Sequence, residues 1–502
     1  MNHTYKSFCS RAAAISVAIA CLFVAYPILS QDSPPSTPTS KVERKNQAPL
    51  SSDILRVKLP KPIEAKLKNG LTVLIAEDHR FPAVSVQLEM SAAGALYEPS
   101  NLAGLASVTA QMLREGTKSR SSKQIAEEAD KLGTSFGAAA EFGSSVTTFG
   151  ASGLSDNFDS WFPLALDVLL NPTFPDHELD NLKQRLGVQL RQQRAAPNFL
   201  AAERFNRAVF GAHPAAVVSA TAESLNSLTP EGLTQWHRER YVPQNAILGF
   251  AGNVRAGELI PKLEKWLADW KPSGLKETLP ANAAPSTGRK IYLVDRPNSV
   301  QTTIALGNIA IDRRSPDYVP MVVMNHILGG GAAARLFLNL REEKGYTYGV
   351  YSDFSALRYA GPWRAGGNMR TEVTAEAVKE FFSEIRRIRD EKVSESELAD
   401  TKRAITARFA LSLEQPTGVL AFAMVRKTYG FPPDYWDTYP ANIMAVTAED
   451  LQRVARQYLN PDTMQLVAVG DADKIKPALE KYGPIEVYDS TGNLAPISGT
   501  VP

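Results

Sequence analysis

The chain has 502 residues, of which 44% are hydrophobic and 22% are charged, and its formal net charge is +2. This length exceeds what one hydrophobic core can organise, so two or more domains are expected in an otherwise ordinary globular composition. The near-neutral charge, with no basic stripe interleaved with aromatic residues, argues against nucleic acid as a partner.

The first 30 residues have the layout of a targeting segment. A basic stretch precedes an apolar run over residues 12–29, and polar sequence follows at once, as in a secretory signal that is cleaved near its end. Because the run is long for such a signal, an uncleaved N-terminal anchor is the alternative. We therefore expect export to a periplasm or to the outside, with attachment to the inner membrane only if the segment is uncleaved.

Both cysteines, Cys9 and Cys21, fall inside this targeting segment. The exported part of the chain is therefore expected to have no disulfide, no thiol nucleophile and no thiolate ligand for a metal.

The rest of the chain divides into two large parts. Residues 31–52 are rich in Pro and Ser and are typical of a flexible tether. Residues 53–270 form a first predicted domain, and the Pro- and Ala-rich residues 271–289 form an inter-domain linker. A second domain is predicted over residues 290–483, followed by a tail over residues 484–502.

The two parts repeat one another. "LTPEGLTQWHRERYVPQNAILGFAGNV" at 228–254 aligns without a gap on "VTAEDLQRVARQYLNPDTMQLVAVGDA" at 446–472. Each stretch predicts a helix with a Thr cap, a turn, and an apolar strand that ends at Gly. Helical stretches at 174–197 and 393–416 align at nearly the same offset, which indicates a duplicated domain.

Each part begins with alternating strands and continues with helices of 3.6 periodicity, such as residues 375–388 and 396–413. Strands and helices grouped in this way predict an α+β fold. We expect two homologous domains, each with helices packed on a mostly antiparallel sheet.

The stretch 101–113, "NLAGLASVTAQML", predicts a helix without any ionisable side chain. Its apolar residues recur at helical spacing, and Ser107 and Gln111 stand one turn apart beside the apolar face.

Two segments carry a resemblance to a known family. "LKNGLTVLIAEDHRFPAVSVQLEMSAAGALYEPSNLAGLASVTAQMLREGT" resembles the N-terminal domain of the insulinase/pitrilysin metallopeptidases, the inverzincins. "ILGGGAAARLFLNLREEKGYTYGVYSDF" is similar to the C-terminal domain of the same family. The resemblance runs from about residue 54 to residue 470 and implies that family's two-domain fold.

Zinc-bearing members carry H-x-x-E-H on the first-domain helix and a further Glu on a later one. The resemblance places Ser107 and Gln111 at the two His positions, Ala110 at the catalytic Glu, and Gln189 at the later ligand. We therefore expect no metal in this chain and no catalytic residue supplied by it. Ser107 as a serine nucleophile is disfavoured, because no G-x-S-x-G turn surrounds it.

The second half keeps another family feature. In the family an Arg and a Tyr seven residues apart bind the substrate backbone, and the resemblance places them at Arg341 and Tyr348. The Gly-rich residues Gly329, Gly330 and Gly331 resemble a substrate-contacting loop of the non-zinc subunits, with a plain connection between helices as the alternative.

The resemblance implies a zinc-free subunit of a two-chain peptidase, similar to the non-catalytic partner of processing peptidases. Such a chain is inactive alone and lends Arg341 and Tyr348 to a homologous subunit that carries the zinc and hydrolyses peptides or unfolded polypeptides. The alternative is a catalytically dead module of the same fold that binds peptides or serves as a scaffold.

Overall fold

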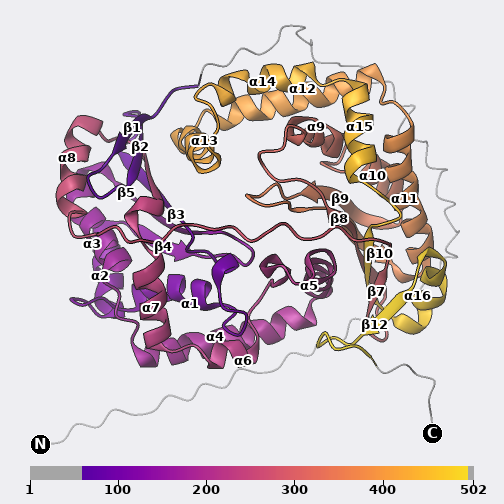
Figure 1. Ribbon diagram of the computed structural model, residues 1–502, viewed down its shortest axis with the longest axis horizontal. Helices are drawn as coiled ribbons and strands as arrows, with labels where there is room; N and C mark the ends of the chain where they lie inside the picture. The colour runs from indigo at the N-terminus through magenta and orange to yellow at the C-terminus, as the bar shows by residue number, and fades with distance from the viewer. Residues whose placement is uncertain (1–58, 496–502) are drawn as a thin grey trace, which may run out of the picture. The chain divides into compact units, whose positions relative to one another are not determined.

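A computed structural model describes residues 59–495 of the chain (Figure 1). The predicted targeting segment 1–30 and tether 31–52 lie outside the described residues. None of the helices within 59–495 combines the length and apolar composition that a membrane span needs.

The first domain contains a six-stranded sheet with the order β1-β2-β6-β3-β5-β4. β2 and β6 are parallel, and the other neighbours are antiparallel. The strands are β1 (Ile63–Lys66), β2 (Thr72–Glu77), β3 (Ala83–Ser91), β4 (Ser135–Ala139), β5 (Val146–Leu154) and β6 (Ala246–Gly252).

Helices of this domain cover one face of the sheet, where α1 packs on β4, α3 packs on β5, and α7 packs on α1 (Figure 1). The helices are α1 (Leu105–Met112), α2 (Ser122–Leu132), α3 (Phe158–Leu170), α4 (Asp176–Ala195), α5 (Pro197–Phe210), α6 (Ala222–Asn226), α7 (Pro230–Arg240) and α8 (Ala256–Trp266). The short 3-10 turns are η2 (Ala95–Tyr97), η3 (Leu113–Glu115), η4 (Ser155–Asn157), η5 (Pro214–Ala216) and η6 (Pro243–Asn245).

The second domain repeats this arrangement with the order β12-β7-β11-β8-β10-β9. Its strands are β7 (Ile291–Asp295), β8 (Gln301–Ile309), β9 (Thr347–Phe354), β10 (Pro362–Arg370), β11 (Gln465–Gly470) and β12 (Ile485–Tyr488). Its α-helices are α9 (Tyr318–Leu328), α10 (Arg335–Phe337), α11 (Thr374–Asp390), α12 (Glu395–Ser412), α13 (Pro416–Tyr429), α14 (Tyr435–Ala445), α15 (Ala448–Tyr458) and α16 (Ala472–Leu479). A π-helical turn, η7 (Leu338–Glu343), and the 3-10 turns η8 (Thr371–Val373) and η9 (Glu480–Tyr482) complete it.

The predicted α+β fold with two homologous domains is confirmed, because the strand orders of the two sheets correspond position by position. They differ at one edge. β1 precedes its domain and pairs antiparallel with β2, whereas β12 follows its domain and pairs parallel with β7. Residues 485–488 lie in the predicted tail 484–502, and their backbone forms β12, which pairs with β7 in the second sheet.

The two domains exchange helices. α5 of the first domain packs on β8 and β11 of the second sheet, and α13 of the second domain packs on β2 and β6 of the first sheet. Both helices begin with proline at their first position, Pro197 and Pro416, where the missing N–H costs nothing. Each sheet is therefore covered by its own helices on one face and by a helix of the other domain on the opposite face.

Successive side chains of a strand point to opposite faces of the sheet, so neighbouring residues of β2 contact the two layers that cover it. On β2, Val73 and Ile75 belong to the core of the first domain, while Leu74 packs with Leu420 of α13. A strand that is apolar on both faces is typical of a sheet covered on both sides.

The linker 271–289 contains no helix or strand and is held by both domains. The Glu277 carboxylate accepts hydrogen bonds from Tyr97 of the first domain and Arg358 of the second. Asn282 accepts a further bond of 2.8 Å from the backbone N–H of Ala360.

Candidate functional site

Helix α1, on which the motif positions lie, starts later than the sequence indicated. The predicted helix 101–113 begins only at Leu105, because Gly104 has a left-handed backbone with φ of 99° that cannot continue a right-handed helix. Its end tightens into the 3-10 turn η3.

Glu98 supplies the cap that α1 otherwise lacks. Its carboxylate accepts hydrogen bonds from the backbone N–H groups of Gly104, at 2.9 Å, and Ala106, at 2.6 Å. Burial raises the pKa of Glu98 to about 7, against the opposing effect of these two bonds. Sequence reasoning missed this residue, because the carboxylate precedes the helix by more than a turn and reaches it only through the fold.

Two of the motif residues on α1, Ser107 and Gln111, contact each other through their side chains. Gln111 Nε2 donates a hydrogen bond of 3.2 Å to Ser107 Oγ, and Ala110 is 1% exposed. Gln189 lies on α4 and is exposed. One helical turn before it, Arg185 lines the same cavity as Ala110 and Gln111.

These side chains do not fit zinc. Structural and catalytic zinc sites use thiolate, imidazole and carboxylate ligands, whereas Ser107, Ala110, Gln111 and Gln189 offer a hydroxyl, a methyl group and two amides. Within residues 59–495 no three His, Cys, Asp or Glu side chains are grouped as a metal site would require.

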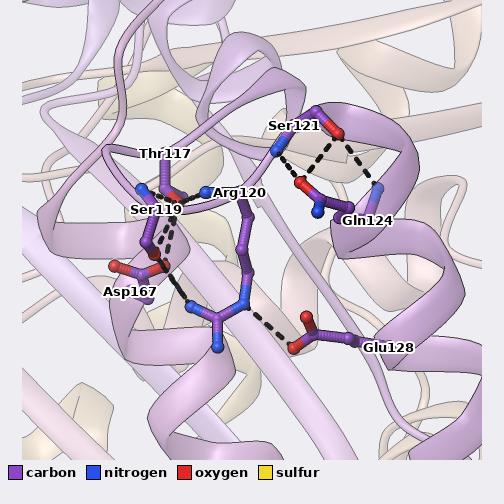
Figure 2. Close-up of polar contacts among 7 residues, drawn as sticks. All are labelled: Thr117, Ser119, Arg120, Ser121, Gln124, Glu128 and Asp167. Atoms are coloured by element: carbon purple, nitrogen blue, oxygen red, sulfur yellow. Dashed lines mark hydrogen bonds and ion pairs between the residues drawn. The ribbon is translucent and has the colours of Figure 1, made fainter.

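The chain leaving α1 is anchored to α3 by one carboxylate. Figure 2 shows Asp167 accepting hydrogen bonds from Thr117, at 2.8 Å, Ser119, at 3.0 Å, and Arg120, at 2.8 Å. Arg120 also pairs with Glu128 of α2 at 2.9 Å. Burial opposes ionisation of Asp167, but these donors, together with the Asn171 side chain at 3.0 Å, lower the pKa of its carboxyl below the usual value.

Helix α2 then starts at a capping box. The backbone N–H of Ser121 donates to the Gln124 side chain at 2.9 Å, and Gln124 N–H donates back to the Ser121 hydroxyl at 3.4 Å (Figure 2). Two otherwise unpaired backbone donors are satisfied. The segment that joins α1 to α2 is thus held at both ends.

Arg341 and Tyr348 lie on either side of a turn in the second domain. Gly345 has a φ of 62°, in the left-handed region where a glycine commonly closes a helix, and the preceding turn η7 is π-helical. Arg341 lies over the ring of Phe337, at 4.7 Å from its centroid, and forms an ion pair of 3.2 Å with Glu342. No hydrogen bond joins the Arg341 and Tyr348 side chains within the described part of the chain.

Tyr348 stands at the edge of the second sheet. It belongs to β9, the last strand in the sheet order, and its side chain is 88% exposed. A large aromatic side chain with this exposure buries almost no apolar surface, so the fold itself gains little from it.

Two of the three glycines in the Gly-rich segment are needed for packing. A Cβ at Gly329 would lie 2.4 Å from Ser352 Oγ, and one at Gly330 would lie 2.7 Å from His326 Cα. The carbonyl of Gly329 also accepts a 2.9 Å bond from Ser352 N–H. Only Gly331 faces open space.

A buried polar cluster that sequence reasoning missed fixes β9 against α9. Asn325 Oδ1 accepts hydrogen bonds of 2.8 Å from both Ser352 Oγ and Trp363 Nε1, and Asn325 Nδ2 donates to the Ser352 carbonyl at 3.1 Å. The only sequence signal was a polar Asn inside a largely apolar helix. This cluster positions the strand that carries Tyr348.

Two family models match the chain. Residues 72–216 match the model of the insulinase family, peptidase family M16, and residues 227–405 match the model described as the peptidase M16 inactive domain.

Several bacterial proteins are similar over most of their length. An uncharacterized zinc protease of Rickettsia felis is 28% identical, covering 70% of this chain and 84% of the relative. The uncharacterized zinc protease YmxG of Bacillus subtilis is 23% identical, covering 79% of this chain and 95% of the relative.

Solved structures share the fold. A crystal structure of a peptidase M16 inactive domain from Pseudomonas fluorescens superposes with a TM-score of 0.76 at 26% identity, covering 82% of this chain and 98% of that one. A protease from Helicobacter pylori superposes with a TM-score of 0.75 at 19% identity, covering 82% and 100% of the two chains.

Proposed function

The chain belongs to the insulinase family, peptidase family M16, and on that premise we propose that it is an exported, zinc-free subunit of a two-chain peptidase. In this proposal a homologous subunit carries the zinc and hydrolyses peptides, and this chain supplies Arg341 and Tyr348. The contrast between the two sites supports the proposal. Ser107 and Gln111, which the resemblance places at metal-ligand positions, bind each other, while Arg341 and Tyr348 are both present and Tyr348 is exposed on the edge strand β9.

The chemistry of the pair suits substrate binding. A guanidinium donates several hydrogen bonds in a fixed geometry and can stabilise a carbonyl oxygen that gains negative charge, and a phenol adds one further donor. The ring of Phe337 under Arg341 limits the orientations of that side chain. The exposed Tyr348 hydroxyl has room to meet a partner's substrate.

The unpaired edges of the two sheets support binding of an extended peptide. β4 and β9 each end a sheet in the described part of the chain, and a free edge offers backbone donors and acceptors to an added strand. A cavity of about 660 Å3 is lined by residues of both domains, among them Phe142, Tyr359 and Tyr429. Its size is in the range that accommodates a ligand side chain or short segment.

The test is a reconstitution. The exported part of the chain, a zinc-motif homologue from the same source, and their mixture are assayed on fluorogenic peptides, with zinc content measured in each sample. We expect no activity from this chain alone, higher turnover from the mixture than from the zinc chain, and loss of that turnover on addition of a chelator. A mixture no faster than the zinc chain would reject the proposal and favour the alternative, a peptide-binding or scaffold module.

A further inference from the structure

A cavity of about 370 Å3 lies beside the motif positions of α1. Ala110 and Gln111 form one wall, and Gly137 and Ala138 of the edge strand β4 form another. Arg185 of α4 lines it from a third element. All residues that line the cavity belong to the first domain, and neither Arg341 nor Tyr348 is among them.

Positive charge dominates this cavity. Arg114, in the turn that ends α1, and Arg185 both line it, and neither makes an ion pair or a side-chain hydrogen bond with any residue between positions 59 and 495. The one carboxylate in the lining, Glu115, accepts a 2.7 Å hydrogen bond from the Ser122 hydroxyl. A position that holds a cation in zinc-bearing relatives is thus surrounded here by more positive than negative charge.

The remaining lining includes apolar side chains. Phe149, Val168 and Leu182 contribute buried surface, whereas Arg114 and Arg185 are themselves exposed, so water screens part of their attraction for an anion. The Gln111 amide contributes a neutral polar group to the same wall.

We propose that this cavity binds a carboxylate group of a peptide, held by Arg114 and Arg185. Guanidinium groups match the planar carboxylate with paired hydrogen bonds. The open edge of β4, where a Cβ at Gly137 would meet nothing, leaves room for peptide backbone next to the cavity. The carboxylate is either the C-terminus of the peptide or an Asp or Glu side chain.

Calorimetric titration of the exported part of the chain with three N-acetylated hexapeptides of Ser, Thr and Val tests this. One peptide ends in a free acid, one ends in an amide and carries a central Glu, and one ends in an amide and is neutral. We expect at least one charged peptide to bind about tenfold tighter than the neutral one, because hydrogen bonds to ionised groups are strong. The charged peptide that binds identifies the source of the carboxylate.

Substitutions at the two arginines test whether the peptide binds in this cavity. Arg114→Gln and Arg185→Gln should each remove most of the preference for the charged peptide, and higher salt should weaken it. Arg191→Gln is the matched control, since Arg191 is an exposed arginine on the same helix that does not line the cavity. Equal affinity for the three peptides, absence of binding, or a preference that survives the double variant R114Q/R185Q would overturn the proposal.

Discussion

Gln111 donates a hydrogen bond of 3.2 Å to Ser107, so the two side chains that the resemblance places at the histidine positions of zinc-bearing members bind each other. The purified chain should accordingly hold well below one zinc ion per molecule after dialysis, measured by mass spectrometry of the metals. Ser107→His with Gln111→His and Gln189→Glu should create a measurable zinc site, because two imidazoles and a carboxylate are sufficient protein ligands. Ser107→His alone is the control and should bind none; stoichiometric zinc in the unmodified chain would contradict the prediction.

Under the proposed function, Arg341→Ala should lower turnover of the proposed two-chain complex by about tenfold or more, because the proposed donor to a developing oxyanion is lost. Tyr348→Phe should lower it less, since only one hydroxyl is removed. Native mass spectrometry should show unchanged assembly for both variants.

Tyr351→Phe is the matched control for the tyrosine. Tyr351 lies on the same strand, is 49% exposed, and packs its ring at 5.6 Å from that of Phe337. Removal of the Tyr351 hydroxyl should leave turnover unchanged. Equal effects of the Tyr348 and Tyr351 substitutions would show that a general surface change, and not the proposed pair, is responsible.

Glu98 predicts a pH dependence of stability. Its folded-state pKa of about 7 lies above the value of about 4.5 expected when unfolded, so the folded state retains the proton longer and stability falls as pH rises from about 4.5 to 7. The contribution is on the order of 3 kcal/mol. Glu98→Gln cannot ionise, so the difference in unfolding free energy between the two proteins should change by roughly this amount between pH 5 and pH 8. If the difference in unfolding free energy between the two proteins, measured with urea, stayed constant from pH 5 to pH 8, the raised pKa of Glu98 would be rejected.

The exchange of helices makes Leu420 important for stability. Leu420 of α13 is 2% exposed and packs over Gly249 of the first sheet, where a Cβ would lie 2.7 Å from its Cδ1. Leu420→Ala should lower the unfolding free energy by about 2–5 kcal/mol through the cavity it leaves. Leu411→Ala, at a side chain that is 65% exposed, should change it by less than about 0.5 kcal/mol. A similar decrease in unfolding free energy for the two variants, measured by thermal unfolding, would contradict this packing.

Asp167→Asn should destabilise the junction between α1 and α2. The charged acceptor of Thr117, Ser119 and Arg120 is lost, which costs about 1.5–3 kcal/mol at pH 7. Because its folded-state pKa is lowered, Asp167 stabilises above its unfolded pKa near 3.8 and this contribution disappears as pH falls through the folded value.

The control for Asp167 is Asp159→Asn on the same helix. Asp159 pairs with Lys262, but its side chain is 62% exposed, and exposed pairs contribute little. If Asp159→Asn lowered the free energy of unfolding as much as Asp167→Asn, negative charge on α3 in general, and not the hydrogen bonds of Asp167, would control stability.

The amino-acid sequence by itself determined the duplication and the local elements. Periodicity located helices such as 375–388, which lies within α11, and 396–413, which begins and ends one residue later than α12. The Thr caps expected for the two repeated helices are present, with Thr229 accepting from Gly232 N–H and Thr447 from Asp450 N–H. These features depend on residues within a few positions of each other, which is why a single sequence reveals them.

The residue types at the motif positions were also readable from the sequence, because a resemblance assigns positions without coordinates. Which neighbours those residues meet was not readable. Arg185, one turn from the expected Gln189, lines the cavity, and Glu98 caps α1 across several intervening residues.

Only the tertiary structure decided that α5 and α13 cross to the opposite sheets and that Asn325 ties β9 to α9. An apolar stripe reports that a helix buries one face, but it carries no information on which surface covers it. That choice depends on contacts between residues hundreds of positions apart, such as Leu74 with Leu420, which form only when both domains are folded.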